Sequence, residues 1–251
     1  EGTTPNGRTA LVLACQGGHD QCARALIKAK ADIEAQIPSG HNALMLSAQN
    51  GHDLCARALI EAGANIEATL ENDRTALMFC AQNGHDLCAR ALIEAGAAVD
   101  AVENKQWTAL MFCAQNGHDL CARALIEAKA DLEKQTAKGL TALMLSAQKG
   151  HEVCARALVK AGSRKDVKNP AGDTALSLVQ QGMAGAHMGV ACDRSGMYPI
   201  VGNRYRSILL GEDLCESEFM KLTSQEQREW ECIPPLTPPA SLGAIAVLLG
   251  A

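Results

Sequence analysis

The sequence predicts an all-α repeat solenoid over most of its length, because two patterns recur along it. A histidine, a cysteine and a leucine each return at steps of 33 residues. Within each step, apolar residues follow the i, i+3, i+4, i+7 spacing that gives a helix one buried face. Periods of about 20 to 50 residues are typical of stacked repeats, whose neighbouring units bury a continuous core. The recurring residues are His19, His52, His85, His118 and His151; Cys22, Cys55, Cys88, Cys121 and Cys154; and Leu11, Leu44, Leu77, Leu110, Leu143 and Leu176.

Each repeat unit is predicted to contain two short helices joined by a turn. In the third unit, RTALMFCAQNG gives a first helix that stops at Gly84, because glycine tolerates the left-handed conformation at a helix end. The second helix starts near His85 with Asp86 in its first turn, where a carboxylate interacts favourably with the helix dipole. Gly96 closes this helix, and AAVDAVENKQ then runs extended to a polar tip that leads to the next unit.

The second helix of this unit has one charged and one apolar face. Asp86, Arg90 and Glu94 fall at i, i+4 and i+8, which predicts two ion pairs along a solvated face of the helix. The apolar face is expected to be buried, with its cysteine pointing inward. Its residues are Cys88, Ala91, Leu92 and Ala95.

The histidine that precedes each cysteine by three residues, as His52 precedes Cys55, could serve a metal ion or a thiol nucleophile. A repeat stack places equivalent atoms about 8 to 10 Å apart, beyond the roughly 7 Å that a disulfide spans between Cα atoms. A zinc site needs ligands that converge on one point, whereas each unit offers one histidine and one inward cysteine. A catalytic pair is rarely copied along a chain. We therefore expect structural roles for both residues, no cofactor and no catalytic residue.

The residue that ends the second helix is not glycine in every unit. Gly63, Gly96 and Gly162 hold this position in three units, whereas Lys30 and Lys129 hold it in the first and fourth. A left-handed conformation costs a non-glycine residue about 1 to 2 kcal/mol. Replacing either lysine by glycine is therefore expected to raise the melting temperature.

The 33-residue pattern resembles the ankyrin repeat. The sequence TALM..AQNGHDLCARALIEAGA stands where that family carries its T-P-L-H, A-A-x-x-G-H and L-L-x-x-G-A-D signatures, with alanine in place of the family's proline. The resemblance implies helix-turn-helix units joined by hairpin loops, and a domain of five repeats and a half repeat at residues 1–182. It also implies a non-catalytic scaffold that binds a partner protein or peptide on its concave face.

The residue before each threonine of the pattern, or before Asn42 where asparagine replaces threonine, differs from unit to unit. Constant positions of a solenoid hold the stack and variable ones meet partners, so this row predicts a recognition surface. Trp107 is the expected anchor because tryptophan is enriched in interface hot spots; the alternative is that Trp107 covers a loop of its own repeat. The row is Arg8, His41, Arg74, Trp107, Leu140 and Asp173. The predicted partner-binding residues are Arg8, His41, Arg74, Lys105, Trp107, Gln115, Asn116, Lys138 and Leu140.

The cations of this surface suggest the chemistry of the partner. Arg8, Arg74 and Lys105 lie at the variable tips, and together they would suit an acidic peptide.

The 33-residue pattern fails after the half repeat, and a second domain is predicted at residues 183–232. HMGVACDRSGMYPIVGNRYRS followed by EDLC, residues 187 to 215, resembles the ZZ-type zinc finger. The resemblance implies a small α+β domain, followed here by a Pro-rich and apolar tail at residues 233–251. Ser195 stands where the family has a zinc-binding cysteine, and a neutral serine is a poor ligand. We therefore expect a degenerate ZZ-like domain without metal.

Two site assignments follow from the ZZ resemblance. One zinc ion held by Cys192, Cys215 and Glu218 is the alternative to a zinc-free domain. Asp193 and Asp213 match positions at which ZZ fingers bind peptide N-termini, and carboxylates suit a protonated amine. Mind bomb-type ubiquitin ligases join ankyrin repeats to ZZ fingers. The alternative function is therefore a substrate-recognition adaptor of a ubiquitin-ligase-type or other regulatory complex.

Composition and charge argue against other function classes. The net charge of −5 comes from interspersed acidic and basic residues, without the continuous basic stripe that nucleic acids attract. The longest apolar run, residues 242 to 251, is about half of the roughly 20 residues that span a membrane. No phosphate-binding loop, serine-hydrolase elbow or kinase signature occurs. The 11 cysteines favour free thiols, so we expect an intracellular protein, cytoplasmic or nuclear. We also expect a monomer.

Overall fold

A computed structural model of the chain describes residues 2–183, 204–207, 213–215, 230–233 and 240–250. The chain divides into two compact bodies, the repeat array at Glu1–Ala175 and a C-terminal body at Leu176–Ala251. The sequence placed this boundary after residue 182, because the 33-residue pattern continues through the half repeat. Each body is described separately below.

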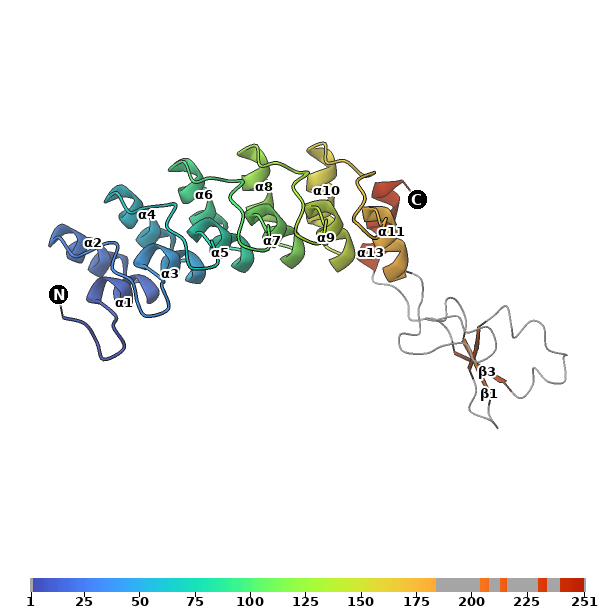
Figure 1. Ribbon diagram of the computed structural model, residues 1–251, viewed down its shortest axis with the longest axis horizontal. Helices are drawn as coiled ribbons and strands as arrows, with labels where there is room; N and C mark the ends of the chain where they lie inside the picture. The colour runs from blue at the N-terminus through green and yellow to red at the C-terminus, as the bar shows by residue number, and fades with distance from the viewer. Residues whose placement is uncertain (1, 184–203, 208–212, 216–229, 234–239, 251) are drawn as a thin grey trace. The chain divides into compact units, whose positions relative to one another are not determined.

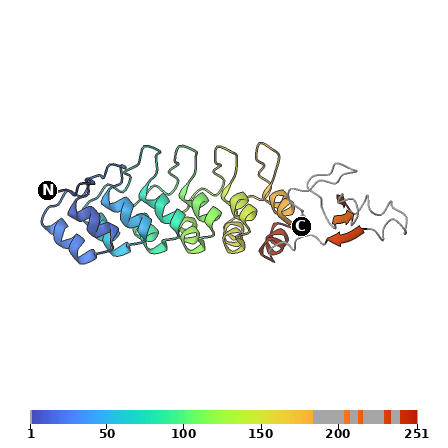
Figure 2. The ribbon, with the colours of Figure 1, turned by 90° about the horizontal axis from the view of Figure 1, so that it is seen from below.

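The array is built from helix pairs, as the repeat pattern predicted. The first helices of successive units stack on one another in one layer and the second helices stack in another (Figure 1). The hairpin loops that join the units project from one edge of the array (Figure 2). The first helices are α1 (Ala10–Gln16), α3 (Ala43–Asn50), α5 (Ala76–Asn83), α7 (Ala109–Asn116) and α9 (Ala142–Lys149). The second helices are α2 (Asp20–Lys28), α4 (Asp53–Glu61), α6 (Asp86–Glu94), α8 (Asp119–Glu127) and α10 (Glu152–Lys160).

The threonine of the pattern caps the first helix of each unit. The Thr75 hydroxyl accepts a hydrogen bond from the Met78 backbone N–H at 3.4 Å, which satisfies one of the free donors of the first turn. Asn42 replaces threonine in the second unit and fills the same role, since its Oδ1 accepts from the Met45 N–H at 2.9 Å. The helix then ends at a left-handed glycine, such as Gly84 with φ of 78°.

The apolar residues of both helices form one continuous core. Leu77, Met78 and Leu92 are at most 2% exposed, and small alanine and cysteine side chains fill the space between the helix layers. The predicted inward cysteine is confirmed in four units, where Cys55, Cys88, Cys121 and Cys154 are buried. In three of these units the thiol lies against a carbonyl in the first helix of the preceding unit. The thiol-to-carbonyl contacts include Cys121 to Cys80 and Cys154 to Cys113, both at 3.9 Å.

Cys22 differs from its equivalents in the other units, because it is exposed. Its equivalents are covered by the first helix of the unit before them, as Cys88 lies 4.0 Å from the Ser47 carbonyl. No described unit precedes Cys22, so the prediction of an inward cysteine is wrong for the first unit.

The prediction of ion pairs along the second helix is wrong for the third unit. Arg90 forms an ion pair with Glu127 of the following unit at 3.1 Å, and Glu94 forms one with Arg57 of the preceding unit at 3.2 Å. Because the units stack, these side chains pair with the second helix of a neighbouring unit and not with the next turn of their own helix. Within-helix pairs occur further on, as between Arg123 and Asp119 at 3.7 Å.

The C-terminal body contains helix α11 (Ala175–Met183) and a three-stranded antiparallel sheet. Its strands β1 (Arg204–Ser207), β2 (Asp213–Cys215) and β3 (Trp230–Ile233) lie in the order β2-β1-β3. Tyr205 is paired with Leu214 on one side and with Cys232 on the other. The strands lie in and just beyond the predicted ZZ-like segment, which is described only in part, so that resemblance stays a prediction.

The predicted apolar tail ends in a helix, α13 (Ala240–Leu249). Ile245, Ala246 and Leu249 are buried, whereas Val247 is 76% exposed. Gly250 follows in the left-handed conformation with φ of 95°, as a left-handed glycine follows several second helices of the array. Among the described residues, none of the helices has the length and hydropathy to cross a lipid bilayer.

Candidate partner-binding site

The hairpin loops before α5, α7 and α9 are tied to one another at their tips. The Asn104 N–H donates to the Asn72 carbonyl at 3.1 Å, and the Ala137 N–H donates to the Lys105 carbonyl at 3.0 Å. These bonds run across neighbouring units and hold three successive loops in a fixed relation. The surface that the loops carry is therefore preorganised, which lowers the entropy lost on binding.

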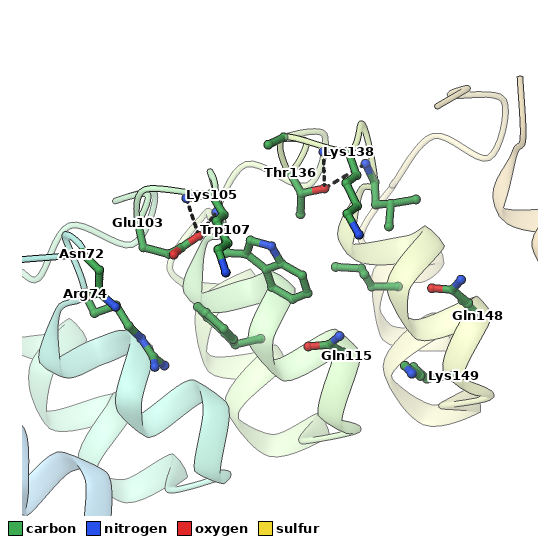
Figure 3. Close-up of a pocket in the computed structure, with 14 residues that line it drawn as sticks. Asn72, Arg74, Glu103, Lys105, Trp107, Gln115, Thr136, Lys138, Gln148 and Lys149 are labelled. Atoms are coloured by element: carbon green, nitrogen blue, oxygen red, sulfur yellow. Dashed lines mark hydrogen bonds between the residues drawn. The ribbon is translucent and has the colours of Figure 1, made fainter. Parts of the chain in front are cut away.

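The loops before α7 and α9 are also braced from within by a side chain. The Glu103 carboxylate accepts the backbone N–H groups of Lys105 at 2.8 Å and Trp107 at 3.2 Å. At the equivalent position of the next loop, the Thr136 hydroxyl accepts the N–H groups of Lys138 at 3.3 Å and Leu140 at 3.2 Å. The dashed lines of Figure 3 mark these bonds.

A hollow of about 700 Å³ lies between these loops and the first helices α7 and α9 (Figure 3). We call it the central trough. Trp107, Phe112, Leu140 and Leu145 give it an apolar lining, and polar and charged side chains surround them. The polar and charged residues are Asn72, Arg74, Glu103, Lys105, Gln115, Thr136, Lys138, Gln148 and Lys149.

Aromatic rings and a guanidinium form a row that leads into the trough. The Arg74 guanidinium carbon lies 4.5 Å from the ring centroid of Phe79 and 4.9 Å from that of Phe112. The Trp107 ring lies 5.1 Å from Phe112, and the His41 ring lies 5.4 Å from Phe79. Cation–π contacts of this kind are worth about 0.5 to 2 kcal/mol each, so the row fixes Arg74 in place.

The side chains that line the trough carry more positive than negative charge. Burial lowers the pKa of the Arg74 guanidinium, and the neighbouring Glu103 carboxylate raises it, but arginine stays charged at any neutral pH. Glu103 is 7% exposed and its carboxylate is bound to loop N–H groups. Lys105, Lys138 and Lys149 are exposed and form no ion pair with any described residue. The trough thus presents unneutralised positive charge to solvent.

The structure brings together part of the predicted recognition surface. Three predicted residues lie outside the trough: Arg8 bonds to Gln16 at 3.1 Å, His41 lies on Phe79, and the Asn116 amide donates to the Gln82 carbonyl at 3.0 Å. Asn116 therefore has a role within the stack. The predicted residues that line the trough are Arg74, Lys105, Trp107, Gln115, Lys138 and Leu140.

Sequence reasoning missed Phe79 and Phe112 of the row, and Leu145 of the trough. The two phenylalanines occupy one position of the repeat, at which Leu13, Leu46 and Leu145 stand in other units. This departure from the repeat pattern is the signal by which they could have been predicted. Phenylalanine at the same repeat position in two neighbouring units marks the part of the surface that differs from the rest.

The recurring histidines hold neighbouring units together in units two to five. The His85 ring Nε2 lies 3.1 Å from the Gln49 carbonyl, and His118 lies 3.0 Å from that of Gln82. No group of three potential metal-binding side chains occurs within the ranges that the structure describes. Burial raises the pKa of the Cys154 thiol to about 12, with Asp119 adding to the shift, so this thiol is not an ionised nucleophile at neutral pH.

The residues suggested by the ZZ resemblance are placed only in part. Asp213 and Cys215 lie in β2, opposite Arg206 and Arg204 of β1. Asp193, Cys192 and Glu218 lie outside the described residues. The proposed peptide and zinc sites are therefore neither confirmed nor contradicted.

Comparison with known proteins supports the nature of the array. A family model described as ankyrin repeats, three copies, matches residues 1–70 and 65–136. A model of a single ankyrin repeat matches residues 138–170. Searching the curated proteins gave no match.

Proposed function

Because the chain belongs to the ankyrin repeat family, we propose that it is a non-catalytic scaffold that binds a partner protein through the central trough. Ankyrin repeats are in general protein-interaction modules. The observation that carries the proposal is a hollow in which Trp107 and Leu140 from two bonded loops lie beside exposed lysines. An aromatic anchor within a polar rim is the usual anatomy of an interface hot spot.

The partner is expected to meet the array over units three to five. The aromatic row, the tip-to-tip hydrogen bonds and the unpaired lysines all coincide there. In the array as a whole, the constant residues are engaged in stacking, as His85 and Asn83 are with the Gln49 carbonyl. The variable loop residues are therefore available to bind the partner. We also propose that the scaffold acts as a monomer.

Proximity labelling in the source cell tests this function. The chain and its Trp107→Ala/Leu140→Ala variant are each fused to a biotin ligase, and the proteins that become labelled are identified. The binding of each labelled protein to the purified chain and to the purified variant is then measured. A matched control, Leu54→Ala/Leu87→Ala, removes two exposed leucines from second helices, away from the trough. We expect the trough variant to lose its main partner and the control to keep it. Retention of every partner by a folded trough variant would refute the proposal.

The alternative is a substrate-recognition adaptor whose C-terminal segment binds peptide N-termini or one zinc ion. The pairing of β1 with β2 supports it, because it brings the Tyr205 and Leu214 segments of the ZZ-like motif side by side. Elemental analysis of the purified full chain distinguishes a zinc-bound from a zinc-free domain. An autoubiquitination assay on the full-length protein separates a ligase from an adaptor.

A further inference from the structure

We propose that the central trough selects a peptide segment in which acidic side chains flank an apolar or aromatic side chain. This inference rests on the proposed function and adds the chemistry of the partner. It draws on the distribution of charge, the apolar lining and the fixed geometry of the loops, each considered in turn below.

Positive charge is concentrated in the trough although the chain as a whole carries a net charge of −5. Four cationic side chains line it against one carboxylate, that of Glu103, which is buried and bound to backbone N–H groups. On the second helices, Arg24, Arg57 and Arg90 are each neutralised by a glutamate of the next unit. The three lysines of the trough form no such pair within the described residues. A partner carboxylate would supply the missing countercharge.

The apolar part of the trough sets a second requirement. Trp107 and Leu140 are half-buried, so each keeps surface that a ligand can cover. In the view of Figure 3, Trp107 lies between Lys105 of its own loop and Lys149 at the end of α9, and Leu140 and Leu145 line the same hollow. An apolar side chain seated here would have carboxylates within reach of lysines on either side. A basic segment would meet like charge, and a purely acidic one would leave the apolar lining uncovered.

Arg74 lines the trough, and its side chain is held in one position by its neighbours. Its guanidinium is held between the rings of Phe79 and Phe112 and bonds to the Gln82 side-chain oxygen. Its charge is therefore immobile, whereas the lysines are exposed and can adjust to the ligand. A fixed arginine and mobile lysines would set the register of the peptide and tolerate variation in acidic positions.

Selection from a library of random short peptides displayed on phage tests the inference without assuming a sequence. The immobilised full chain is the target, and binders are counter-selected on the Trp107→Ala/Leu140→Ala variant. We expect the surviving peptides to carry aspartate or glutamate on both sides of a leucine, phenylalanine or tryptophan. Survivors that are neutral or basic would overturn the inference.

Charge reversal then tests the lysines directly. Fluorescence anisotropy with a selected peptide should show roughly tenfold weaker binding to Lys105→Glu/Lys138→Glu, since each reversal replaces an attraction by a repulsion. The control Lys28→Glu/Lys160→Glu makes the same change of net charge on second helices and should bind normally. Equal loss in both variants, no loss in either, or displacement of the peptide by oligothymidylate would contradict an acidic peptide as ligand.

Different results would contradict the scaffold function and the proposed peptide chemistry. If trough-dependent peptides or partners exist but are not acidic, the chemistry is wrong and the scaffold function stands. If neither a peptide nor a cellular partner depends on Trp107 and Leu140, the trough is not the binding site and both proposals fall.

Discussion

The glycine that ends α3, α5 or α7 lies against the histidine that starts the second helix of the following unit. A Cβ added at Gly84 would lie 2.6 Å from Nδ1 of His118, and one added at Gly51 would lie 2.5 Å from Nδ1 of His85. Both glycines also have φ near 78°. A side chain is thus excluded at this position by its own backbone and by the neighbouring unit.

Gly84→Ala is expected to destabilise the array more than Gly96→Ala. Both positions are left-handed, with φ of 78° and 91°, but nothing lies within 4 Å of a Cβ at Gly96. The shared conformational cost is about 1 to 2 kcal/mol, and the clash with His118 adds about 1 to 3 kcal/mol. Urea unfolding measures both. In a His118→Ala background the two substitutions should cost the same, and a persistent difference would show that the histidine is not the cause.

Lys30 and Lys129 occupy left-handed positions, as the sequence predicted, with φ of 61° and 65°. Lys30→Gly and Lys129→Gly should each raise the melting temperature, because glycine removes a conformational cost of about 1 kcal/mol. Differential scanning calorimetry provides the measurement. Lys28→Gly, at the last residue of α2, serves as the control and should lower the melting temperature. A decrease in both test variants would contradict the explanation.

At the scale of elements, the second helices are joined by a ladder of ion pairs. Arg24–Glu61, Arg57–Glu94 and Arg90–Glu127 link α2 to α4, α4 to α6 and α6 to α8. The next pair would need an acidic residue at position 160, where Lys160 stands. Arg123 pairs instead with Asp119 of its own helix at 3.7 Å. The ladder therefore stops before α10.

Lys160→Glu should extend the ladder and stabilise the array by up to about 1 kcal/mol, the upper range for an exposed pair. Lys160 and Arg123 line the same small hollow between α8 and α10, so the new carboxylate would be in reach. Urea unfolding at low salt is the measurement, with Lys160→Gln to separate loss of repulsion from gain of a pair. The extra stability of glutamate over glutamine should disappear at high salt or with Arg123→Ala.

At the scale of the whole molecule, buried thiols run through the array from Cys15 to Cys154. Burial raises the pKa of Cys15 to about 12, and it raises those of Cys80 and Cys113 well above their usual value. In each of these cases desolvation disfavours the thiolate. The folded array therefore keeps these thiols protonated under conditions in which an unfolded chain ionises them.

The free energy of unfolding should accordingly fall as pH rises above 9, the ordinary thiol pKa, towards 12. Over this range the unfolded state binds fewer protons than the folded state, so rising pH favours unfolding. Urea unfolding between these pH values measures the slope, and Cys15→Ala should make it shallower. An unchanged slope in that variant would contradict the assignment.

Alkylation gives a second measurement on the same thiols. Among the cysteines of the repeat array, Cys22 is the exposed one, so iodoacetamide should modify it before the other cysteines of the array in the native protein. Peptide mass spectrometry identifies the modified positions. Rapid modification of Cys88 or Cys121 in folded protein would show that the core opens more readily than its burial implies.

The sequence by itself determined the helix pairs, the glycines that end them and the left-handed lysines, because these depend on local spacing that the chain repeats every 33 residues. It also identified Trp107 and Leu140 as variable positions and Lys138 as a partner-binding residue. The tertiary structure decided which of them share one hollow, which partner each arginine takes, and that Phe79 and Phe112 hold Arg74. Those contacts join residues of neighbouring units, and their geometry depends on how one unit stacks on the next.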